Sequence, residues 1–563
     1  MSGIRENRKR KRQESATPTV TDENITDISS SEEEAANEVD EDEEIDSEEE
    51  FEGENPADKR RRLAKQYLEN LKTEANEIVN ADEAGELDEE SRHIDNYNNF
   101  DAGDLDREII SSRLKEDVAE QQGRVYRFIS DRLDFDNVKT TFTRVGENNP
   151  TSLSCYQPQF NKFDASSFGK QSKNKLFCYV VSKDMTLTKY DITNFNSRPK
   201  KIRSTKGGKQ FIPETKFEYE NTSEGHYDEI LTVAASPKGD VVVTGGRDRK
   251  LIVWSTESLA PIKVIPTKDR KGQILSLTFR RNSDQLYVAC ADYKIRTYSI
   301  SQFAQLETLY GHHDIVADIS ALSMERCVTV GSRDRTAMLW KIPDETRLTF
   351  RGGEDPDRLL KKWLKTNATE KENGDLEYPQ ESEAPLFFGE GSIEVVSMID
   401  DSHFVTGSDN GSISLWSLAK KKPVFIERSA HGLLPAPEVD EISGESSKEL
   451  RERQVQDRKL VKPYWITSIY AIPYSNLFVS GSWNGSLKVW KINENLREFE
   501  LVKELSNCHG VVTKIHYVEA GKHGKENFRI LASVAKEHRL GRWVTRVPGA
   551  RNGIYSAVLK SKA

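Results

Sequence analysis

One short pattern occurs seven times in the C-terminal two-thirds of the chain. In each copy a polar or charged residue is followed, six positions later, by an aromatic residue that ends an apolar stretch. The polar residues are Asp184, Asp248, Asp292, Asp334, Asn410, Asn484 and Glu537, and the aromatic residues are Tyr190, Trp254, Tyr298, Trp340, Trp416, Trp490 and Trp543. A repeat of this kind predicts a fold in which copies of one supersecondary element pack side by side.

The repeated unit is typical of the four-stranded blade of a WD40 β-propeller. The copy at residues 225–254, GHYDEILTVAASPKGDVVVTGGRDRKLIVW, alternates apolar and polar residues in three stretches separated by turn residues. We therefore predict an all-β fold, a seven-bladed WD40 β-propeller with N-terminal α-helices and a disordered acidic tail. Propellers of this kind present loops for binding and rarely carry out chemistry of their own.

Two blades contain a His near their start, and in both the interval from His to Trp is 28 residues. The residues are His226, Asp248 and Trp254 in the second blade and His312, Asp334 and Trp340 in the fourth. With a hydroxyl from the second strand they can form a buried chain of hydrogen bonds, and a buried Asp without such partners would be costly. We predict a structural role for these six residues, and we expect blades 3, 5 and 6, which lack the Gly-His pair, to be held by packing.

The intervals between successive aromatic residues are 64, 44, 42, 76, 74 and 53 residues, whereas a blade takes about 40–45. The excess predicts long insertions near residues 198–216, 344–390 and 428–462, with a short helix near 359–364 and a helix in the last insertion. We expect the propeller to occupy residues 128–563. Either residues 554–559 or a segment near Phe142 could complete the last blade.

The region before the propeller is strongly charged. Residues 22–54 contain 18 acidic and no basic side chains, residues 1–21 carry a net charge of +4, and residues 55–563 carry +3. We predict that residues 1–55 form a disordered tail, and that residues 56–127 are helical and pack on the propeller or dock partner proteins. The basic block Arg8, Lys9, Arg10, Lys11 and Arg12 is either a nuclear localisation signal or a solvated run of charge.

The sequence offers no basis for catalysis. It lacks a phosphate-binding loop, a nucleophilic-serine motif and a Cys/His cluster with metal-ligand spacing. Its five Cys are scattered, and no run of about 18 apolar residues occurs. We therefore expect no catalytic residues, metal, cofactor, small-molecule substrate or membrane span, and an enzyme is the weakest of the hypotheses.

Binding is better supported, because basic residues flank the repeated polar position in several blades. In WD40 propellers these flanks lie on one face, around the central channel. The candidates are Arg247, Arg249, Lys250, Lys294, Arg333, Arg335, His538 and Arg539, together with Trp483. Arg and Trp side chains suit a phosphate backbone with unpaired bases, and they also suit a partner protein. Secondary candidates are Arg280 and Arg281 on the opposite face and Lys200, Lys201 and Arg203 in the first insertion.

Two segments ahead of the propeller are more distinctive than the repeats. They are RRRLAKQYLENLK at residues 60–72 and ISSRLKEDVAEQQGRVYRFI at residues 110–129. Together with the acidic N-terminal tract and the seven blades, these segments resemble the ribosomal-RNA-processing protein 9 family. This family comprises WD-repeat subunits specific to the U3 small nucleolar ribonucleoprotein, and the resemblance covers residues 56–563.

The resemblance implies a non-catalytic protein of the nucleus and nucleolus. It implies binding to the box B/C region of U3 small nucleolar RNA, together with the kink-turn-binding protein of that particle. It also implies action with other small-subunit processome proteins in pre-ribosomal RNA processing towards 18S rRNA and the small ribosomal subunit. The alternative is a WD40 scaffold, such as a chromatin or ubiquitin-ligase adaptor, that does not bind RNA.

Overall fold

The computed structural model describes residues 126–562 except for several internal segments. These are residues 157–174, 213–223, 266–271, 354, 371–375, 381–383, 436–443, 445, 452–460, 523–524 and 545–546. The predicted acidic tail, the basic block at residues 8–12 and the predicted N-terminal helices lie outside the described residues.

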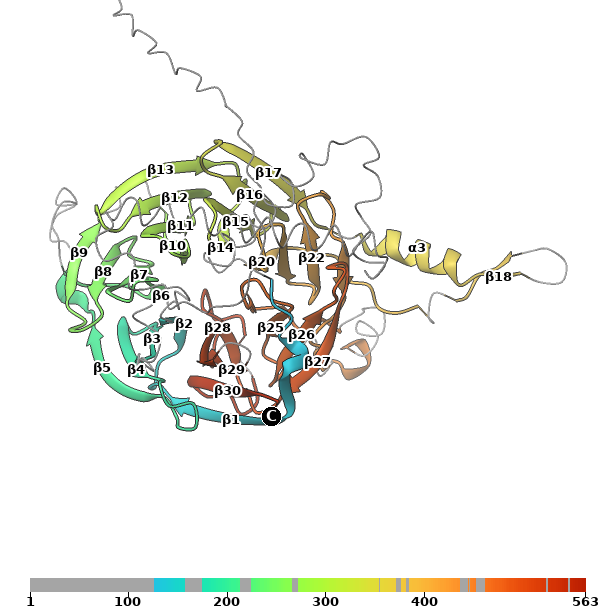
Figure 1. Cartoon of the computed structure of the whole chain (residues 1–563). Coiled ribbons are helices and arrows are strands. Elements are labelled where there is room, and N and C mark those ends of the chain that lie inside the picture. The colour runs from blue at the N-terminus through green and yellow to red at the C-terminus, as the bar shows by residue number, and fades with distance from the viewer. Residues whose placement is uncertain are drawn as a thin grey trace, which may run out of the picture. The chain divides into compact units, whose positions relative to one another are not determined.

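In the described part of the chain the strands form seven four-stranded antiparallel sheets around a common axis (Figure 1). Blade 1 contains β2 (Pro150–Tyr156), β3 (Phe177–Ser182), β4 (Thr186–Asp191) and β5 (Lys200–Lys206); blade 2 contains β6 (Ile230–Ala235), β7 (Val241–Gly246), β8 (Leu251–Ser255) and β9 (Pro261–Ile265). Blade 3 contains β10 (Ile274–Phe279), β11 (Gln285–Cys290), β12 (Lys294–Ser299) and β13 (Ala304–Tyr310); blade 4 contains β14 (Val316–Ala321), β15 (Arg326–Gly331), β16 (Thr336–Lys341) and β17 (Thr346–Arg351). The predicted WD40 propeller is confirmed.

The remaining blades follow the same order from the axis outward. Blade 5 contains β20 (Ile393–Met398), β21 (His403–Ser408), β22 (Ile413–Ser417) and β23 (Phe425–Glu427); blade 6 contains β24 (Ser468–Ala471), β25 (Leu477–Gly481), β26 (Leu487–Ile492) and β27 (Phe499–Leu505). Blade 7 contains β28 (Val511–Lys522), β29 (Lys525–Ala535), β30 (Gly553–Ser561) and β1 (Leu133–Arg144). The first strand of each blade contacts the first strand of the next, and β28 contacts β2, so the ring is closed.

The hydrophobic core lies between neighbouring sheets. One cluster, for example, joins Val243 and Val253 of blade 2 to Leu277 and Val288 of blade 3. Because each inner strand is covered on both faces, its residues are buried almost without interruption, as in β7. The outer strand β5 is exposed along nearly its whole length. This difference explains why the apolar pattern of the sequence marks the inner three strands of a blade more clearly than the fourth.

Blade 7 combines strands from both ends of the described chain. β30 pairs with β29 on one side and with β1 on the other, with Phe142 opposite Tyr555. Both segments considered for closure therefore belong to the same blade, β30 as its third strand and β1 as its outer strand. The seventh sequence repeat was assigned to the wrong strand, since residues 536–552 form the loop between β29 and β30 and Trp543 lies in that loop.

The three predicted insertions contain regular structure. Residues 198–216 include the outer strand β5 and a short 3-10 helix, η5 (Lys209–Phe211). Residues 344–390 include β17, helix α3 (Pro356–Thr366) and the hairpin of β18 (Thr369–Glu370) and β19 (Leu376–Glu377). Helix α3, which was expected near 359–364, begins after Asp355, whose side chain accepts a hydrogen bond from the Asp357 amide. In the third insertion residues 448–451 are helical.

Closure by β1 has a measurable consequence. Removal of residues 1–144 should lower the free energy of unfolding by about 4 kcal/mol or more, because it leaves an edge of β30 unpaired and removes the buried Leu133 and Ile129. Urea denaturation followed by circular dichroism measures the change. Removal of residues 1–125 is the matched control, since β1 is retained. Equal stability of the two truncated proteins would contradict the assignment of β1 as a closing strand.

Candidate functional site

A chain of buried hydrogen bonds fixes blade 2 at its turn. Nδ1 of His226 lies 2.8 Å from Asp248 Oδ2, and Nε2 lies 2.7 Å from the hydroxyl of Thr244. The indole Nε1 of Trp254 donates to the same hydroxyl at 2.7 Å. The chain links the entry loop, the second strand, the third strand and the turn between them, so the turn is held by side chains from every part of the blade.

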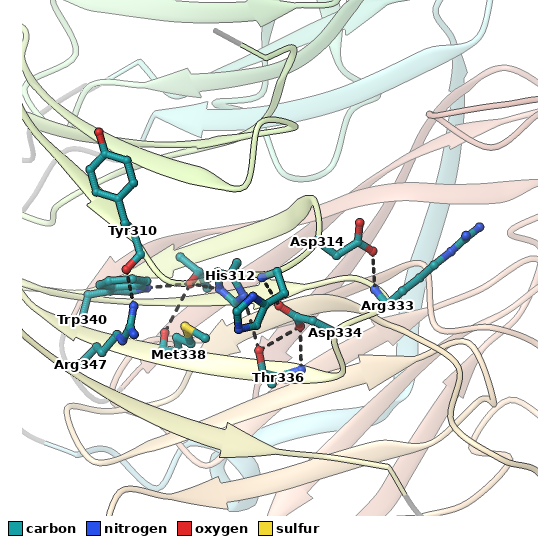
Figure 2. A network of polar contacts seen from close by, with 11 residues as sticks. Tyr310, His312, Asp314, Arg333, Asp334, Thr336, Met338, Trp340 and Arg347 are labelled. Carbon is teal, nitrogen blue, oxygen red and sulfur yellow. Dashed lines mark hydrogen bonds and ion pairs between the residues drawn. The ribbon is translucent and has the colours of Figure 1, made fainter. Parts of the chain in front are cut away.

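Blade 4 contains the same arrangement (Figure 2). His312 lies 2.8 Å from Asp334 through Nδ1 and 2.8 Å from Thr329 through Nε2, and Trp340 donates to Thr329 at 2.8 Å. Burial alone would raise the pKa of Asp334, but the hydrogen bond and charge of His312 and a bond from Thr336 hold it below its usual value. Asp334 is therefore anionic at neutral pH and accepts all of these bonds.

Blade 6 has a third such chain that sequence reasoning missed. His431 lies 2.8 Å from Ser480 and 3.1 Å from Asn484, and Trp490 donates to Ser480 at 2.8 Å. The expectation that blade 6 is held by packing alone is therefore wrong. The insertion at residues 428–462 separates His431 from its blade and hides the usual spacing. Burial lowers the pKa of His431 to about 4, which keeps its ring neutral.

Blades 3 and 5 use other polar pairs. In blade 3 Arg296 is buried and donates to Asp292 at 3.1 Å. In blade 5 the Ser408 hydroxyl donates to Glu390, and Trp416 donates to Thr406 at 2.8 Å. In the blade 5 turn the side chain of Asn410 accepts from the amide and the hydroxyl of Ser412. Polar contacts therefore anchor the turns of blades 3 and 5 as well, and the expectation that packing alone holds these blades is wrong.

The anchored turns hold the candidate arginines on one face of the propeller. We call the top face the end at which the second strand of each blade turns into the third, as at residues 247–250. Arg249 and Arg335 occupy left-handed backbone positions, at φ +64° and +53°, and both are exposed. Arg333 is also exposed and points away from the hydrogen-bond chain in Figure 2, while its amide donates to Asp314. Arg247 is 38% exposed and forms an ion pair with Glu229 at 3.1 Å.

Lys250 and Lys294 are less exposed than Arg249, Arg333 and Arg335. The amine of Lys250 lies 3.4 Å from the carbonyl oxygens of Phe211 and Gly225, and burial lowers its pKa. The amine of Lys294 lies over the ring of Tyr310, 5.1 Å from its centre. Because these two amines are partly buried, they are weaker candidates for direct contact with a partner.

The other three top-face candidates do not point outward. His538 is buried, and burial lowers its pKa to about 3. Arg539 extends inward and donates to the carbonyls of Leu275 at 2.7 Å and Ala317 at 2.9 Å. Trp483 is only 9% exposed. The predicted outward orientation of these three residues is wrong. His538 and Arg539 lie in a long loop where the repeat predicts a tight turn, and neighbouring aromatic rings cover Trp483.

Arg539 belongs to a charged network at the axis. The carboxylate of Asp318 on β14 accepts from Lys514 of β28 at 3.0 Å and from Ser276 of β10 at 2.6 Å. Burial alone would raise the pKa of Asp318, but the charges of Lys514 and Arg539 keep it below its usual value. The network joins blade 7 to blades 3 and 4 across the axis, and it balances the buried carboxylate with cations.

The secondary candidates lie away from the top face. Arg280, in the turn at the opposite end of blade 3, is paired with Glu325 at 2.7 Å, and Arg281 stacks over Tyr474 with 5.9 Å to the ring centre. Lys200, Lys201 and Arg203 lie exposed on the outer strand β5. The structure therefore divides the candidate residues among three surfaces.

An aromatic cluster on the top face was not identified from the sequence as a unit. Trp483 packs edge-on against Tyr464 and Trp465, at 5.9 and 6.0 Å, and Trp465 lies 6.4 Å from Trp543. Trp543 in turn lies 4.6 Å from His538. The adjacent Tyr464 and Trp465 just before β24 are visible in the sequence. Their contact with the β29–β30 loop joins segments that are far apart in the chain, so the sequence pattern does not predict it.

The described residues also bear on metal binding, membrane insertion and disulfide formation. Among them no three His, Cys, Asp or Glu side chains are grouped as a metal site would require, and no helix is both long and apolar enough to cross a membrane. The side chains of Cys155, Cys178, Cys290, Cys327 and Cys508 are buried, and none of them forms a disulfide.

Comparison with known proteins gives a consistent set of relatives. The WD domain, G-beta repeat family matches residues 217–255, 303–341 and 459–491. Ribosomal RNA-processing protein 9 of Saccharomyces cerevisiae is 68% identical over 569 residues, covering 99% of both chains. U3 small nucleolar RNA-interacting protein 2 of Homo sapiens is 27% identical and covers 89% of this chain and 82% of its own. A solved structure described as the crystal structure of RRP9 WD40 repeats superposes with a TM-score of 0.53 at 25% identity, covering 75% of this chain and 97% of that one.

The hydrogen-bond chain of blade 4 can be tested by mutation. Asp334→Ala should lower the free energy of unfolding by about 2–4 kcal/mol, because it leaves His312 and the turn amides without their acceptor. Thermal and urea denaturation measure the loss. Arg333→Ala, an adjacent exposed position, should change stability by less than about 0.5 kcal/mol. If Asp334→Ala unfolds no more easily than the parent, the structural role of the Asp is refuted.

The buried histidines predict a pH dependence. The pKa values of His431 and His516 are lowered by burial to about 4, below the value near 6.5 expected in the unfolded chain. Between these values the unfolded chain binds more protons, so stability falls as the pH falls from about 6.5 towards 4. Each His contributes a slope of up to about 1.4 kcal/mol per pH unit. Urea denaturation at pH 7, 6 and 5 measures the slope, and His431→Gln should make it shallower; an unchanged slope would mean that His431 is not buried neutral.

Proposed function

Because the chain belongs to the family of ribosomal RNA-processing protein 9, we propose that it is a non-catalytic subunit of the U3 small nucleolar ribonucleoprotein that binds U3 small nucleolar RNA. The observation that carries this proposal is the identity to the yeast protein, which extends over nearly the whole of both chains. We further propose that the protein binds the box B/C region of this RNA directly, together with the kink-turn-binding protein of the particle.

The same reasoning leads us to propose a setting for the protein. It acts in the small-subunit processome, in pre-ribosomal RNA processing towards 18S rRNA, and it resides in the nucleolus. The basic block at residues 8–12 serves as its nuclear localisation signal. A propeller suits this setting, because it offers a rigid surface on which RNA and proteins assemble.

The top face is the proposed RNA-binding surface. Arg249, Arg333 and Arg335 are exposed there on turns that buried Asp residues anchor. A guanidinium group can donate two parallel hydrogen bonds to a phosphate, and an anchored turn loses little conformational entropy when it binds. Arg247 would have to exchange its ion pair with Glu229 for a phosphate, which is a small change at a partly exposed site.

Charge reversal tests the proposed surface. The quadruple change Arg247→Glu, Arg249→Glu, Arg333→Glu and Arg335→Glu should lower the affinity for a U3 RNA transcript at least tenfold. It should also make the dependence of log K on log salt less steep, by about 0.7 for each lost phosphate contact to single-stranded RNA. Filter binding or fluorescence anisotropy across a salt series measures both, with the RNA alone and with the kink-turn-binding protein already bound.

The control for this experiment reverses Lys200, Lys201 and Arg203 on the outer strand β5, where the same kind of charge lies on the side wall. This variant should keep the affinity and salt dependence of the parent. Loss of binding in the control with normal binding in the top-face variant would move the RNA site to the wall. If the parent protein has no affinity for U3 RNA, with or without the kink-turn-binding protein, the scaffold alternative is favoured.

A further inference from the structure

The loop at residues 536–552 lies on the top face, where it replaces the tight turn between the second and third strands of blade 7. It joins β29 to β30, a position at which blade 2 has only the tight turn of residues 247–250. The amide of Lys536 donates to Asn552 at 2.9 Å and to Asn149 at 3.2 Å. Lys183 in the corresponding turn of blade 1 donates to the carbonyl of His538 at 3.0 Å. The loop therefore starts from anchored positions between blades 7 and 1.

The side chain of Arg539 extends from this loop to blades on the far side of the axis. Its two hydrogen bonds go to carbonyl groups of Leu275 in β10 and Ala317 in β14, so blade 7 is connected to blades 3 and 4. The charge of Asp318 favours this position of the guanidinium. A loop with contacts to four blades is held in place, although it lies at the surface.

The next part of the loop presents Trp543 on a built support. Its ring lies 4.6 Å from His538 and 6.4 Å from Trp465. A Cβ atom at Gly541 would collide with this ring, so only Gly at that position permits the observed geometry. Despite these contacts the residue is 53% exposed. One side of a large aromatic ring is thus packed on the protein, and the rest faces solvent.

The loop that carries this ring also carries positive charge. Arg542 is 83% exposed, with its Nε 3.5 Å from the carboxylate of Glu537. The loop also lines an open cavity of about 390 Å³ with Lys536, Val547, Gly549, Ala550 and Arg551. In the described part of this loop four side chains are cationic and one is a carboxylate, namely Lys536, Arg539, Arg542 and Arg551 against Glu537. This excess of positive charge favours a polyanionic ligand. Aromatic rings stack on unpaired bases of any sequence, and nearby cations bind the phosphates of the same strand.

We propose that Trp543 stacks on an unpaired nucleobase of the bound RNA, and that Lys536, Arg542 and Arg551 hold the adjoining phosphates. This assignment rests on the proposed function, and it adds a base-stacking contact to the proposed phosphate contacts of the top face. The arginines of the other blades attract the phosphate backbone, whereas Trp543 distinguishes an unpaired base from a base inside a duplex. The axial contacts of Arg539 act indirectly, since they position the loop.

The experiment compares Trp543→Ala and Trp543→Phe with the parent, using a U3 RNA transcript, a ten-nucleotide oligouridine and a fully paired RNA duplex as probes. Trp543→Ala should weaken binding of U3 RNA and oligouridine roughly 5- to 150-fold, the range expected for loss of one stacked base. The salt dependence should stay that of the parent, because no phosphate contact is removed. Trp543→Phe should retain most of the affinity, and binding of the duplex should not change in either variant.

Two further variants control for folding and position. Gly541→Ala should weaken oligouridine binding without removing any contacting group, because its Cβ displaces the ring. Phe303→Ala removes an aromatic residue that is 36% exposed in the turn between β12 and β13, at the opposite end of blade 3, and should leave binding unchanged. Equal melting temperatures of all variants exclude a loss caused by unfolding.

Each other outcome overturns the assignment in a recognisable way. If the parent binds U3 RNA with the expected salt dependence and Trp543→Ala binds equally well, the stacking site is refuted while the proposed function stands. If Trp543→Ala keeps its RNA affinity but no longer assembles into the U3 particle in cells, the residue contacts a protein instead. If the parent binds neither U3 RNA nor oligouridine, the proposed function and the stacking site fail together.

Discussion

The structure depends on the requirement that each sheet be covered on both of its faces. The inner strands of every blade are apolar on both sides, so a blade at the end of an open row would expose one of these faces to water. Seven twisted sheets around an axis satisfy the requirement only when the last contacts the first, as β28 and β2 do. The pairing of β1 with β30 then ties the two ends of this ring through backbone hydrogen bonds. All surface features of the protein are positioned by this closed ring.

Polar groups inside the ring determine which of its surfaces are rigid. The His, Thr, Asp and Trp chains of blades 2 and 4 anchor turns whose arginines face solvent, and the axial network of Asp318, Lys514 and Arg539 fixes a much longer loop. In both cases a buried carboxylate needs hydrogen-bond donors from several strands, and those donors immobilise the backbone next to it. The top face thereby combines exposed charge with a fixed geometry, which favours binding of a ligand with a defined shape.

The sequence predicted the architecture well, because seven strongly apolar strands with a repeated spacing leave few other folds. It predicted the structural residues of blades 2 and 4, where His and Trp are close in the chain, and it missed the same arrangement at His431, where an insertion intervenes. Trp543 was taken for a strand residue because the spacing to Glu537 happens to match the repeat. The outer strand β5 resembled a loop because its residues are exposed and charged.

Side-chain orientation was the part of the candidate site that the sequence could predict least. Arg333 and Arg539 both stand one or two positions from the repeated polar residue, yet one is exposed and the other reaches the carbonyls of two distant blades. What decides between these orientations is the set of long-range neighbours, such as Asp318 beside Arg539. Such neighbours become visible only when the blades are placed around the axis.

The position of β1 also has a consequence for the order in which the protein can fold during synthesis. β1 is the first of the described strands to leave the ribosome, and its partner β30 is the last of them to be made. Loop closure over this distance is entropically costly, and an unpaired strand edge is prone to wrong pairing while it waits. The first six blades can assemble in sequence as they emerge, whereas the final step joins segments separated by more than four hundred residues. A nascent chain therefore exposes both ends of an open ring until translation has passed Ser561.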